Sequence, residues 1–401
     1  MRHMVPDHGV ARVRQPIHPV YAQMEQTIFD AMSGLARETG AINLGQGFPE
    51  GHAPPELIEA AAHALREKSN QYPPGAGLPE LRAAVADFYR RRQGLAIDPG
   101  QVIVTSGATE AIADAVLALV QPGEEAILFQ PAYDAYAPLV RRAGGVPVSV
   151  PLAPPDWHYP LEVLAAAITP RTRVLFLNDP LNPAGTAASE AELAGIAALC
   201  VAHDLVVISD EVWEDVRFDG KAHRSIMTFP GMAGRTVKLG SAGKLFGLTG
   251  WKTGWMIAGE RLVGGLGRAH QFVTYTTPPA LQWAVAEGLA LPDAWFERQR
   301  AEWAASRERL RAGLEREDFI VLSNVATWFL CIDLAASGVS LGDRKFAERA
   351  VREAGVASIP LSALFVGTRA PSHILRLCFT KPDDALDEAV ERLGRFRRAL
   401  A

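Results

Sequence analysis

The chain has few cysteines and no long apolar segment. Cys200, Cys331 and Cys378 are the only cysteines among 401 residues, and they lie too far apart for a disulfide framework or a CxxC metal site. We therefore interpret them as buried free thiols and predict no metal site. The apolar runs fall well short of a membrane-spanning helix, and residues 1–18 lack the apolar core of a secretory signal. These absences predict a cytoplasmic protein.

The chain also lacks a large excess of charge of either sign. Its 40 basic and 45 acidic residues give a net charge of −5 and are spread along the sequence, without a run of Lys and Arg that would bind a polyanion. We therefore predict neither a nucleic-acid nor a membrane partner. Apolar residues make up 48% of the chain and charged residues 21%, a balance that is typical of a globular protein with a substantial core.

Short β-branched runs alternate with helical segments from about residue 54 to residue 260. This alternation is typical of βα units around a mostly parallel sheet, so we predict an α/β fold. Helices are expected between most of the strands, including residues 107–120 and 190–203. The strand candidates are residues 102–105, 126–129, 146–150, 174–177, 205–209, 236–239 and 256–258.

After about residue 280 the pattern changes to long charged amphipathic stretches, which favour a smaller α+β domain. Its predicted helices are residues 294–317 and 342–354, and its predicted strands are residues 327–333 and 374–379. The N-terminal segment has a strand candidate at residues 41–44. We predict a large domain over residues 51–290, and a small domain that combines residues 1–50 with residues 291–401.

Two motifs follow predicted strands, where α/β proteins bind ligands. Residues 105–110 (TSGATE) lie at a strand-to-helix junction, where free N–H groups and the helix dipole favour an anion such as phosphate. A plain helix cap explains this segment about equally well. Asp210 follows an apolar strand and fits either a helix N-cap or a counter-ion that keeps a cofactor's pyridine nitrogen protonated. The local sequence leaves both alternatives open.

Lys244 is one of only seven lysines in the chain, and small residues precede it. The segment 241–244 (SAGK) follows a predicted strand, and small residues there let the backbone approach a ligand closely. A surface lysine is the ordinary alternative. Burial and nearby cations lower the pKa of an amine, so that it can condense with an aldehyde and then move protons. Residues 178–185 (NDPLNPAG) form a second candidate loop, which two X-Pro bonds stiffen and which also fits a plain turn.

Taken in order, these motifs resemble those of the fold-type I, class I pyridoxal-phosphate-dependent aminotransferases. The chain is most similar to the branch that contains kynurenine, glutamine, methionine and N-succinyldiaminopimelate aminotransferases. The resemblance covers nearly the whole chain and implies a large domain around a mostly parallel seven-stranded sheet, with a smaller α+β domain. It rests on residues 42–49, 70–72, 105–110, 131–134, 210–212, 241–244, 249–255 and 375–379.

The resemblance implies a role for each matching residue. Lys244 would carry pyridoxal 5'-phosphate as a Schiff base and move the proton between substrate and cofactor, while Asp210 would pair with the pyridinium nitrogen. Arg376 would clamp the substrate α-carboxylate, helped by Asn182 and the backbone N–H of Gly47. Tyr72 would reach the phosphate of the neighbouring subunit, which requires a homodimer. The remaining cofactor contacts implied are Asn182 at the phenolic oxygen, Tyr133 on the ring, and Gly107, Ala108, Ser241 and Lys252 around the phosphate.

The chain departs from the family pattern at a few of these positions. Trp213 stands where relatives usually have a tyrosine that hydrogen-bonds the cofactor, and an indole can donate one N–H but cannot accept or ionise. Leu181 replaces a frequent histidine, Ala184 a usual threonine, and Trp328 an aromatic residue that is more often tyrosine. Together these departures predict a bulkier and less polar cofactor surround.

The function implied is transfer of an amino group from an L-amino acid to a 2-oxo acid by a ping-pong route. Residues 275–279, which the family places near the substrate side chain, contain no arginine for a second carboxylate. This favours an apolar or aromatic donor such as methionine, phenylalanine or kynurenine over aspartate, and leaves glutamine and N-succinyldiaminopimelate open. One alternative is a cysteine-conjugate β-lyase, which would release pyruvate and ammonia without an amino acceptor. A non-catalytic binding module is the other, and the presence of Lys244, Asp210 and Arg376 argues against it.

Overall fold

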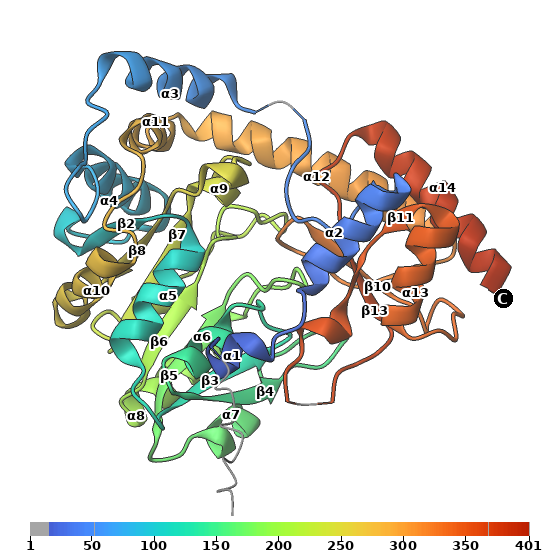
Figure 1. Ribbon diagram of the computed structural model, residues 1–401, viewed down its shortest axis with the longest axis horizontal. Helices are drawn as coiled ribbons and strands as arrows, with labels where there is room; N and C mark the ends of the chain where they lie inside the picture. Colours follow the sequence, from blue (N-terminus) through green and yellow to red (C-terminus); the bar gives the residue numbers. More distant parts are fainter. Residues whose placement is uncertain (1–15, 52, 368, 401) are drawn as a thin grey trace, which may run out of the picture.

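The computed structural model describes residues 16–51, 53–367 and 369–400, so the first 15 residues of the predicted N-terminal segment lie outside the described part. A seven-stranded sheet forms the larger layer of the molecule (Figure 1). Its strands run in the order β2-β8-β7-β6-β5-β3-β4, and only β8 is antiparallel to its neighbours. The strands are β2 (Val102–Thr105), β3 (Glu125–Gln130), β4 (Val146–Pro151), β5 (Thr172–Asn178), β6 (Val206–Asp210), β7 (Thr236–Ser241) and β8 (Gly254–Ala258).

This sheet confirms the predicted α/β class, and each predicted strand is present with its ends shifted by at most a few residues. Successive strand residues point to opposite faces, and both faces are buried, as is usual for parallel sheets. On one face Val174, Phe176 and Ile208 pack with α5 and α6, while on the other Leu175 and Val207 pack with α8. The helices around the sheet are α3 (Pro55–Glu67), α4 (Pro79–Gln93), α5 (Ala108–Leu119), α6 (Tyr136–Arg142), α7 (Leu161–Ala167), α8 (Glu190–Ala202), α9 (Ala242–Leu245), α10 (Glu260–Val273) and α11 (Pro279–Leu289).

A four-stranded antiparallel sheet of order β12-β13-β10-β9 forms the smaller layer, on the right in Figure 1. A parallel pair of β1 and β11 joins the N-terminal segment to it, and Met32 and Ala36 of α2 pack in the same core as Phe396 of α14. The predicted domain boundaries at residues 50 and 290 stay a prediction. The elements here are α2 (Ile28–Thr39), β1 (Ile42–Asn43), α12 (Asp293–Arg316), β9 (Ile320–Val321), β10 (Phe329–Asp333), α13 (Asp343–Arg349), the π-helix η4 (Ala350–Ala354), β11 (Val356–Ala357), β12 (Ile359–Pro360), β13 (Ile374–Cys378) and α14 (Asp383–Leu400). The short helix α1 (Pro19–Ala22) lies instead against α6 of the large layer (Figure 1).

Four short 3-10 helices complete the described chain. They are η1 (Pro99–Gln101), η2 (Ile226–Thr228), η3 (Thr249–Trp251) and η5 (Leu361–Leu364). All three cysteines are free and buried, which confirms their predicted state. Among the described helices, none has both the length and the apolar character needed to cross a membrane.

The topology gathers the predicted site residues at one edge of the large sheet. Strands β2, β3, β5, β6 and β7 run in the same direction, so their carboxyl ends lie together, where α/β proteins bind ligands. Asp210 ends β6, and Ser241 ends β7 directly before α9. The turn after β2 leads into α5, and the loop after β3 carries Tyr133. Motifs that are more than a hundred residues apart in the sequence therefore meet in one place.

Candidate active site

A pocket of about 420 Å³ lies at this edge, between the large sheet and the smaller layer. Every predicted site residue except Tyr72 lines it. The predicted site residues that line it are Gly47, Gly107, Ala108, Tyr133, Asn182, Asp210, Trp213, Ser241, Lys244, Lys252 and Arg376, and their roles stay predictions. The lining therefore brings together the groups that the family resemblance assigned to one active site.

Lys244 lies in the one-turn helix α9, which begins where β7 ends. Its Nζ donates to the carbonyl oxygen of Gly47 at 3.3 Å and lies 4.7 Å from the centre of the Trp213 ring and 5.1 Å from that of Trp328. Burial lowers the pKa of Lys244 to about 8, and the charge of Arg376 acts in the same direction against the opposing effect of Asp210. An amine with this pKa has a substantial neutral, nucleophilic fraction near neutral pH.

Asp210 is buried at the end of β6 and accepts a hydrogen bond from the hydroxyl of Tyr136 at 2.5 Å. Burial raises the pKa of Asp210, while the Tyr136 hydroxyl and the Val212 N–H oppose the shift. Tyr136 itself stays protonated, because burial and the nearby Asp210 raise its pKa well above the usual value. A cationic group in front of Asp210 would offset the cost of burying this carboxylate.

Arg376 is a buried guanidinium on β13, held by two hydrogen bonds. One terminal nitrogen donates to Asn182 Oδ1 at 3.0 Å and the other to the carbonyl oxygen of Gly45 at 2.7 Å, while the ring of Phe329 lies 3.9 Å from the guanidinium carbon. The Nε atom has no partner among the described residues. A buried guanidinium with donors to spare is suited to bind a carboxylate. Burial lowers the pKa of Arg376 to about 10, so it is charged at neutral pH.

The turn before α5 provides the site for an anion. Gly107 is the N-cap residue with φ of 77°, and as a glycine it has no side chain to cap the N–H groups of the first turn. A Cβ atom at Gly107 would lie 3.2 Å from Lys252 Nζ, so glycine leaves room for the ammonium beside the free N–H groups. A helix N-terminus next to a cation is a favourable site for phosphate. This geometry supports the phosphate interpretation of residues 105–110 over a plain helix cap.

The chain matches the family described as aminotransferase class I and II over residues 39–393. It belongs to this family. The chain is 44% identical to a probable N-succinyldiaminopimelate aminotransferase of Mycobacterium tuberculosis, over 92% of this chain and 95% of the relative. It is 37% identical to a methionine aminotransferase of Escherichia coli, over 92% and 96%. Among solved structures, the Mycobacterium tuberculosis N-succinyldiaminopimelate aminotransferase superposes with a TM-score of 0.92 at 43% identity, covering 96% of this chain and all of that one.

These comparisons confirm the fold-type I architecture and show that the chain is an aminotransferase of the pyridoxal-phosphate-dependent type. The structure of a methionine aminotransferase from Escherichia coli agrees, with a TM-score of 0.90 at 35% identity over 95% of this chain and all of that one. The non-catalytic alternative is therefore not supported.

The family departures in this aminotransferase lie in two different places. Trp213 lines the pocket, and its ring meets that of Trp328 edge to face at 4.9 Å, so the two indoles form an apolar wall beside Lys244. Leu181 and Ala184 instead pack in the core beneath the sheet and are not part of the lining. The bulkier, less polar surround stays a prediction for Trp213 and Trp328, whereas Leu181 and Ala184 do not line the pocket, so that part of the prediction was wrong.

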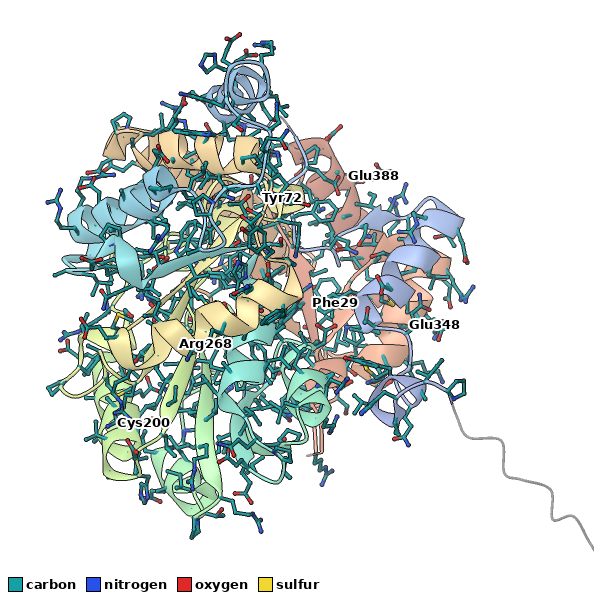
Figure 2. All side chains as sticks on the ribbon, turned by 60° about the vertical axis from the view of Figure 1, so that its left-hand side comes forward. Phe29, Tyr72, Cys200, Arg268, Glu348 and Glu388 are labelled. Carbon is teal, nitrogen blue, oxygen red and sulfur yellow. The ribbon has the colours of Figure 1, made fainter. Side chains whose placement is uncertain are left out.

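Tyr72 is outside the pocket of its own chain. It is 84% exposed, and its ring packs edge to face against that of Tyr275 at 5.7 Å. Tyr72 lies on the loop after α3 and is labelled in Figure 2. Its implied contact with a neighbouring subunit stays a prediction.

Several residues of the site were not singled out from the sequence. Tyr136, the partner of Asp210, lies three residues after Tyr133 on the same segment, and this spacing is the one local signal that could have identified it. Others come from the N-terminal segment or from β10 and were not named as site residues, although Gln46 lies within the matching motif 42–49: Thr27, Phe29, Asp30, Gln46 and Phe329. They reach the pocket through packing between segments that are remote in the sequence.

Proposed function

We propose that this aminotransferase holds pyridoxal 5'-phosphate at Lys244 and transfers the amino group of an apolar or aromatic L-amino acid to a 2-oxo acid. The observation that carries the proposal is the position of the Lys244 amine in one pocket with Asp210, Lys252 and Arg376. These residues supply a nucleophile, a counter-ion for a pyridinium, a phosphate ligand and a carboxylate ligand.

The pocket fits the polar parts of this cofactor. Gly107, Ala108, Ser241 and Lys252 surround the place for its phosphate, and Asp210 lies where a protonated ring nitrogen would offset the burial of its carboxylate. Tyr133 and Asn182 line the same pocket, and the family resemblance assigns them to the cofactor ring and its phenolic oxygen. When bound, the cofactor withdraws electrons from the substrate α-carbon and so makes its proton removable.

Lys244 is the proposed base and acid of the reaction. Its amine, with a pKa of about 8, can take the proton from the substrate α-carbon, hold it at Nζ and release it again. Asp210 stays oriented because Tyr136 donates to its carboxylate, and the side-chain amide of Asn178 donates to its backbone carbonyl oxygen at 2.9 Å. Asn178 also accepts from the Asn182 N–H at 2.8 Å, within the loop of residues 178–185, so Asn178 links this loop to the end of β6.

Arg376 is the proposed ligand of the α-carboxylate. Its hydrogen bond to Asn182 and its contact with the Phe329 ring hold the guanidinium plane in one orientation. A carboxylate bound in that plane places the substrate α-carbon at a reproducible distance from the Lys244 amine. Asn182 therefore orients Arg376 as well as lining the cofactor site.

The charges of the lining favour an uncharged donor side chain. Among the described residues that line the pocket, the cations are Lys244, Lys252 and Arg376, and each has a role towards the cofactor or the α-carboxylate. Phe29, Asp30 and Asp134 line the rest of the opening, where a second carboxylate would meet like charge. Methionine, phenylalanine or kynurenine fits this surface better than aspartate. N-succinyldiaminopimelate is the second candidate donor, because a relative that is 44% identical is named a probable N-succinyldiaminopimelate aminotransferase.

We further propose a cytoplasmic homodimer in which Tyr72 completes the site of the neighbouring subunit. The exposure of Tyr72 on a loop outside its own pocket supports this arrangement. All three cysteines are free, which supports a cytoplasmic location because thiols stay reduced there.

Half-reactions with single amino acids test the donor class. The purified protein with cofactor should lose its visible absorbance roughly tenfold faster with methionine, phenylalanine or kynurenine than with aspartate. An apolar side chain that fills an apolar site raises the reaction rate by about this factor. Stopped-flow absorbance over a panel of L-amino acids measures it. A faster reaction with aspartate or N-succinyldiaminopimelate would show that the donor assignment is wrong, whereas a chain that binds no cofactor would contradict the function itself.

Exchange of Trp213 for tyrosine tests the role of the apolar wall that Trp213 and Trp328 form beside Lys244. The phenol of Trp213→Tyr would donate a hydrogen bond to the anionic phenolic oxygen of the bound cofactor, so the pH midpoint of the visible spectrum should fall by roughly one unit. Spectroscopic titration measures the shift. Trp303→Tyr is the matched control, because Trp303 packs on Trp328 at 5.3 Å without lining the pocket. Equal midpoints in the wild type and Trp213→Tyr would contradict a tuning role for Trp213.

A further inference from the structure

A buried histidine outside the pocket joins two segments that border the phosphate site. His270 lies on α10, which packs against α5; Figure 2 shows the two helices side by side, with α10 marked by the label of Arg268. Its Nδ1 is 2.9 Å from Glu110 Oε1 and 3.2 Å from Asp114 Oδ2, and its Nε2 is 2.9 Å from the carbonyl oxygen of Gly75. His270, Glu110 and Asp114 are 1%, 7% and 0% exposed.

These contacts define the protonation of the imidazole ring. A carbonyl oxygen can only accept, so Nε2 must carry a proton, and the charge of the ring depends on the second proton, which Nδ1 shares with the carboxyl groups of Glu110 and Asp114. Burial raises the pKa of Glu110, but hydrogen bonds from His270, Thr274 and Ser106 outweigh burial and lower this pKa, so the proton belongs to Nδ1 and His270 is an imidazolium. Burial lowers the pKa of His270, but hydrogen bonds to Asp114 and Glu110 outweigh burial and raise this pKa to about 10. The 2.9 Å contact from Nδ1 to Glu110 is the length of an ordinary hydrogen bond, which favours a proton over a metal ion between them.

Glu110 connects the imidazolium to the anion-binding turn. It is the third residue of α5, and its Oε2 accepts a hydrogen bond from the backbone N–H of Ser106, directly before Gly107. Its Oε1 also accepts from the Thr274 hydroxyl. This carboxylate stabilises the turn by binding the N–H of the residue before the N-cap Gly107. Its negative charge would at the same time oppose a phosphate bound at the same helix end, and His270 supplies the compensating positive charge.

Gly75 connects the same imidazolium to the loop that carries Tyr72. A Cβ atom at Gly75 would lie 3.4 Å from the ring of Tyr275, and that ring is the one against which Tyr72 packs. The Tyr275 N–H donates to the carbonyl oxygen of His270 at 3.3 Å. The position of the Tyr72 loop thus depends on α10 and on His270 in particular.

We propose that His270 is a positioning residue for the cofactor phosphate, whose imidazolium holds Glu110 on the Ser106–Gly107 turn, neutralises that carboxylate and fixes the loop of Tyr72. The inference rests on the proposed function, because it assigns a phosphate to this end of the pocket. The proposal predicts that loss of the His270 charge weakens binding of the cofactor phosphate and leaves binding of the cofactor ring unchanged.

Replacement of the imidazolium by a neutral amide tests the inference. In His270→Gln the dissociation constant for pyridoxal 5'-phosphate should rise roughly tenfold, the loss of one favourable charge interaction of about 1.4 kcal/mol, and inorganic phosphate should compete correspondingly less well. Pyridoxal, which lacks the phosphate, should bind the variant and the wild type within about a factor of two. Equilibrium titration of the cofactor-free full chain measures all three. His203→Gln, an exposed histidine at the end of α8, is the control and should match the wild type.

The other outcomes would overturn either the inference or the proposed function. Equal losses for pyridoxal and its phosphate, or no loss for either, would show that His270 has a structural role alone and overturn the inference. A wild type that binds pyridoxal and its phosphate equally would contradict the proposed function at the phosphate end. A change in cofactor affinity after treatment of the wild type with a chelator would place a metal in the cluster and also overturn the inference. If His270→Gln does not fold, ¹⁵N NMR of histidine-labelled wild type decides, because a neutral His270 ring at pH 8 would contradict the imidazolium.

Discussion

Lys244→Ala is expected to abolish turnover, with kcat falling by at least about four orders of magnitude, because the variant lacks both the nucleophile and the proton carrier. The visible band of the bound cofactor should lose its dependence on pH, since no amine remains to condense with the aldehyde. Absorbance spectra at several pH values, together with a coupled assay of 2-oxo acid formation, measure both effects. In the wild type without cofactor, modification of Lys244 by an amine reagent should rise with pH around a midpoint of about 8, because the neutral amine is the nucleophile.

Lys221→Ala is the control for this replacement, because Lys221 is exposed and lies outside the pocket. It should keep the spectrum and the rate of the wild type. Lys244→Ala that still showed a pH-sensitive band and turned over would assign the nucleophile to another residue. Lys252, the other lysine of the pocket lining, would then be the first to examine.

Arg376→Lys should lower kcat/KM for the amino donor roughly a hundredfold while changing cofactor affinity by less than about a factor of two. A lysine ammonium cannot make the planar bidentate contact with a carboxylate, and it would leave Asn182 Oδ1 or the Gly45 carbonyl oxygen without its donor. Steady-state kinetics with both substrates measure the loss, which should appear in the KM for the amino acid and for the 2-oxo acid alike.

Arg141→Lys on the exposed side of α6 is the control, with kinetics expected to equal those of the wild type. An Arg376→Lys variant with unchanged KM values for both substrates would show that the α-carboxylate binds elsewhere. A loss of cofactor affinity equal to the loss in kcat/KM would instead indicate that Arg376 supports the cofactor site rather than the substrate.

Much of the large sheet could be predicted from the sequence because its strands are continuous apolar runs, as strands buried on both faces must be. The position of the site could be predicted where its residues lie at the carboxyl ends of those strands, as Asp210 and Ser241 do. The strands β9, β11 and β12 were not predicted, and each is only two residues long, too short to show periodicity. The equally short β1 was covered because it falls within the strand candidate at residues 41–44. The strand expected over residues 327–333 begins later, at Phe329, because Thr327 has φ of 64°, outside the extended region.

Tertiary contacts account for the parts of the site that the sequence did not reveal. Phe29 and Gln46 enter the pocket because α2 and the segment after β1 pack beside β10 and β13, and no local pattern encodes that contact. The hydrogen bond between Tyr136 and Asp210 joins residues 74 positions apart. Leu181 was expected beside the cofactor because it belongs to the loop of residues 178–185, but its side chain is buried in the core. Loop membership by itself does not tell which side chains face a ligand.

The pocket has two halves of different origin, and this division bears on how the enzyme can evolve. The groups proposed to hold the cofactor, such as Asp210, Lys244 and Lys252, come from the large sheet and its turns, whereas Phe29, Asp30 and Gln46 come from the N-terminal segment. Mutations in that segment can therefore alter which amino acid is accepted while the chemistry is inherited intact. We expect substrate preference to drift among descendants of this chain chiefly through residues 27–47, under selection that leaves the sheet untouched.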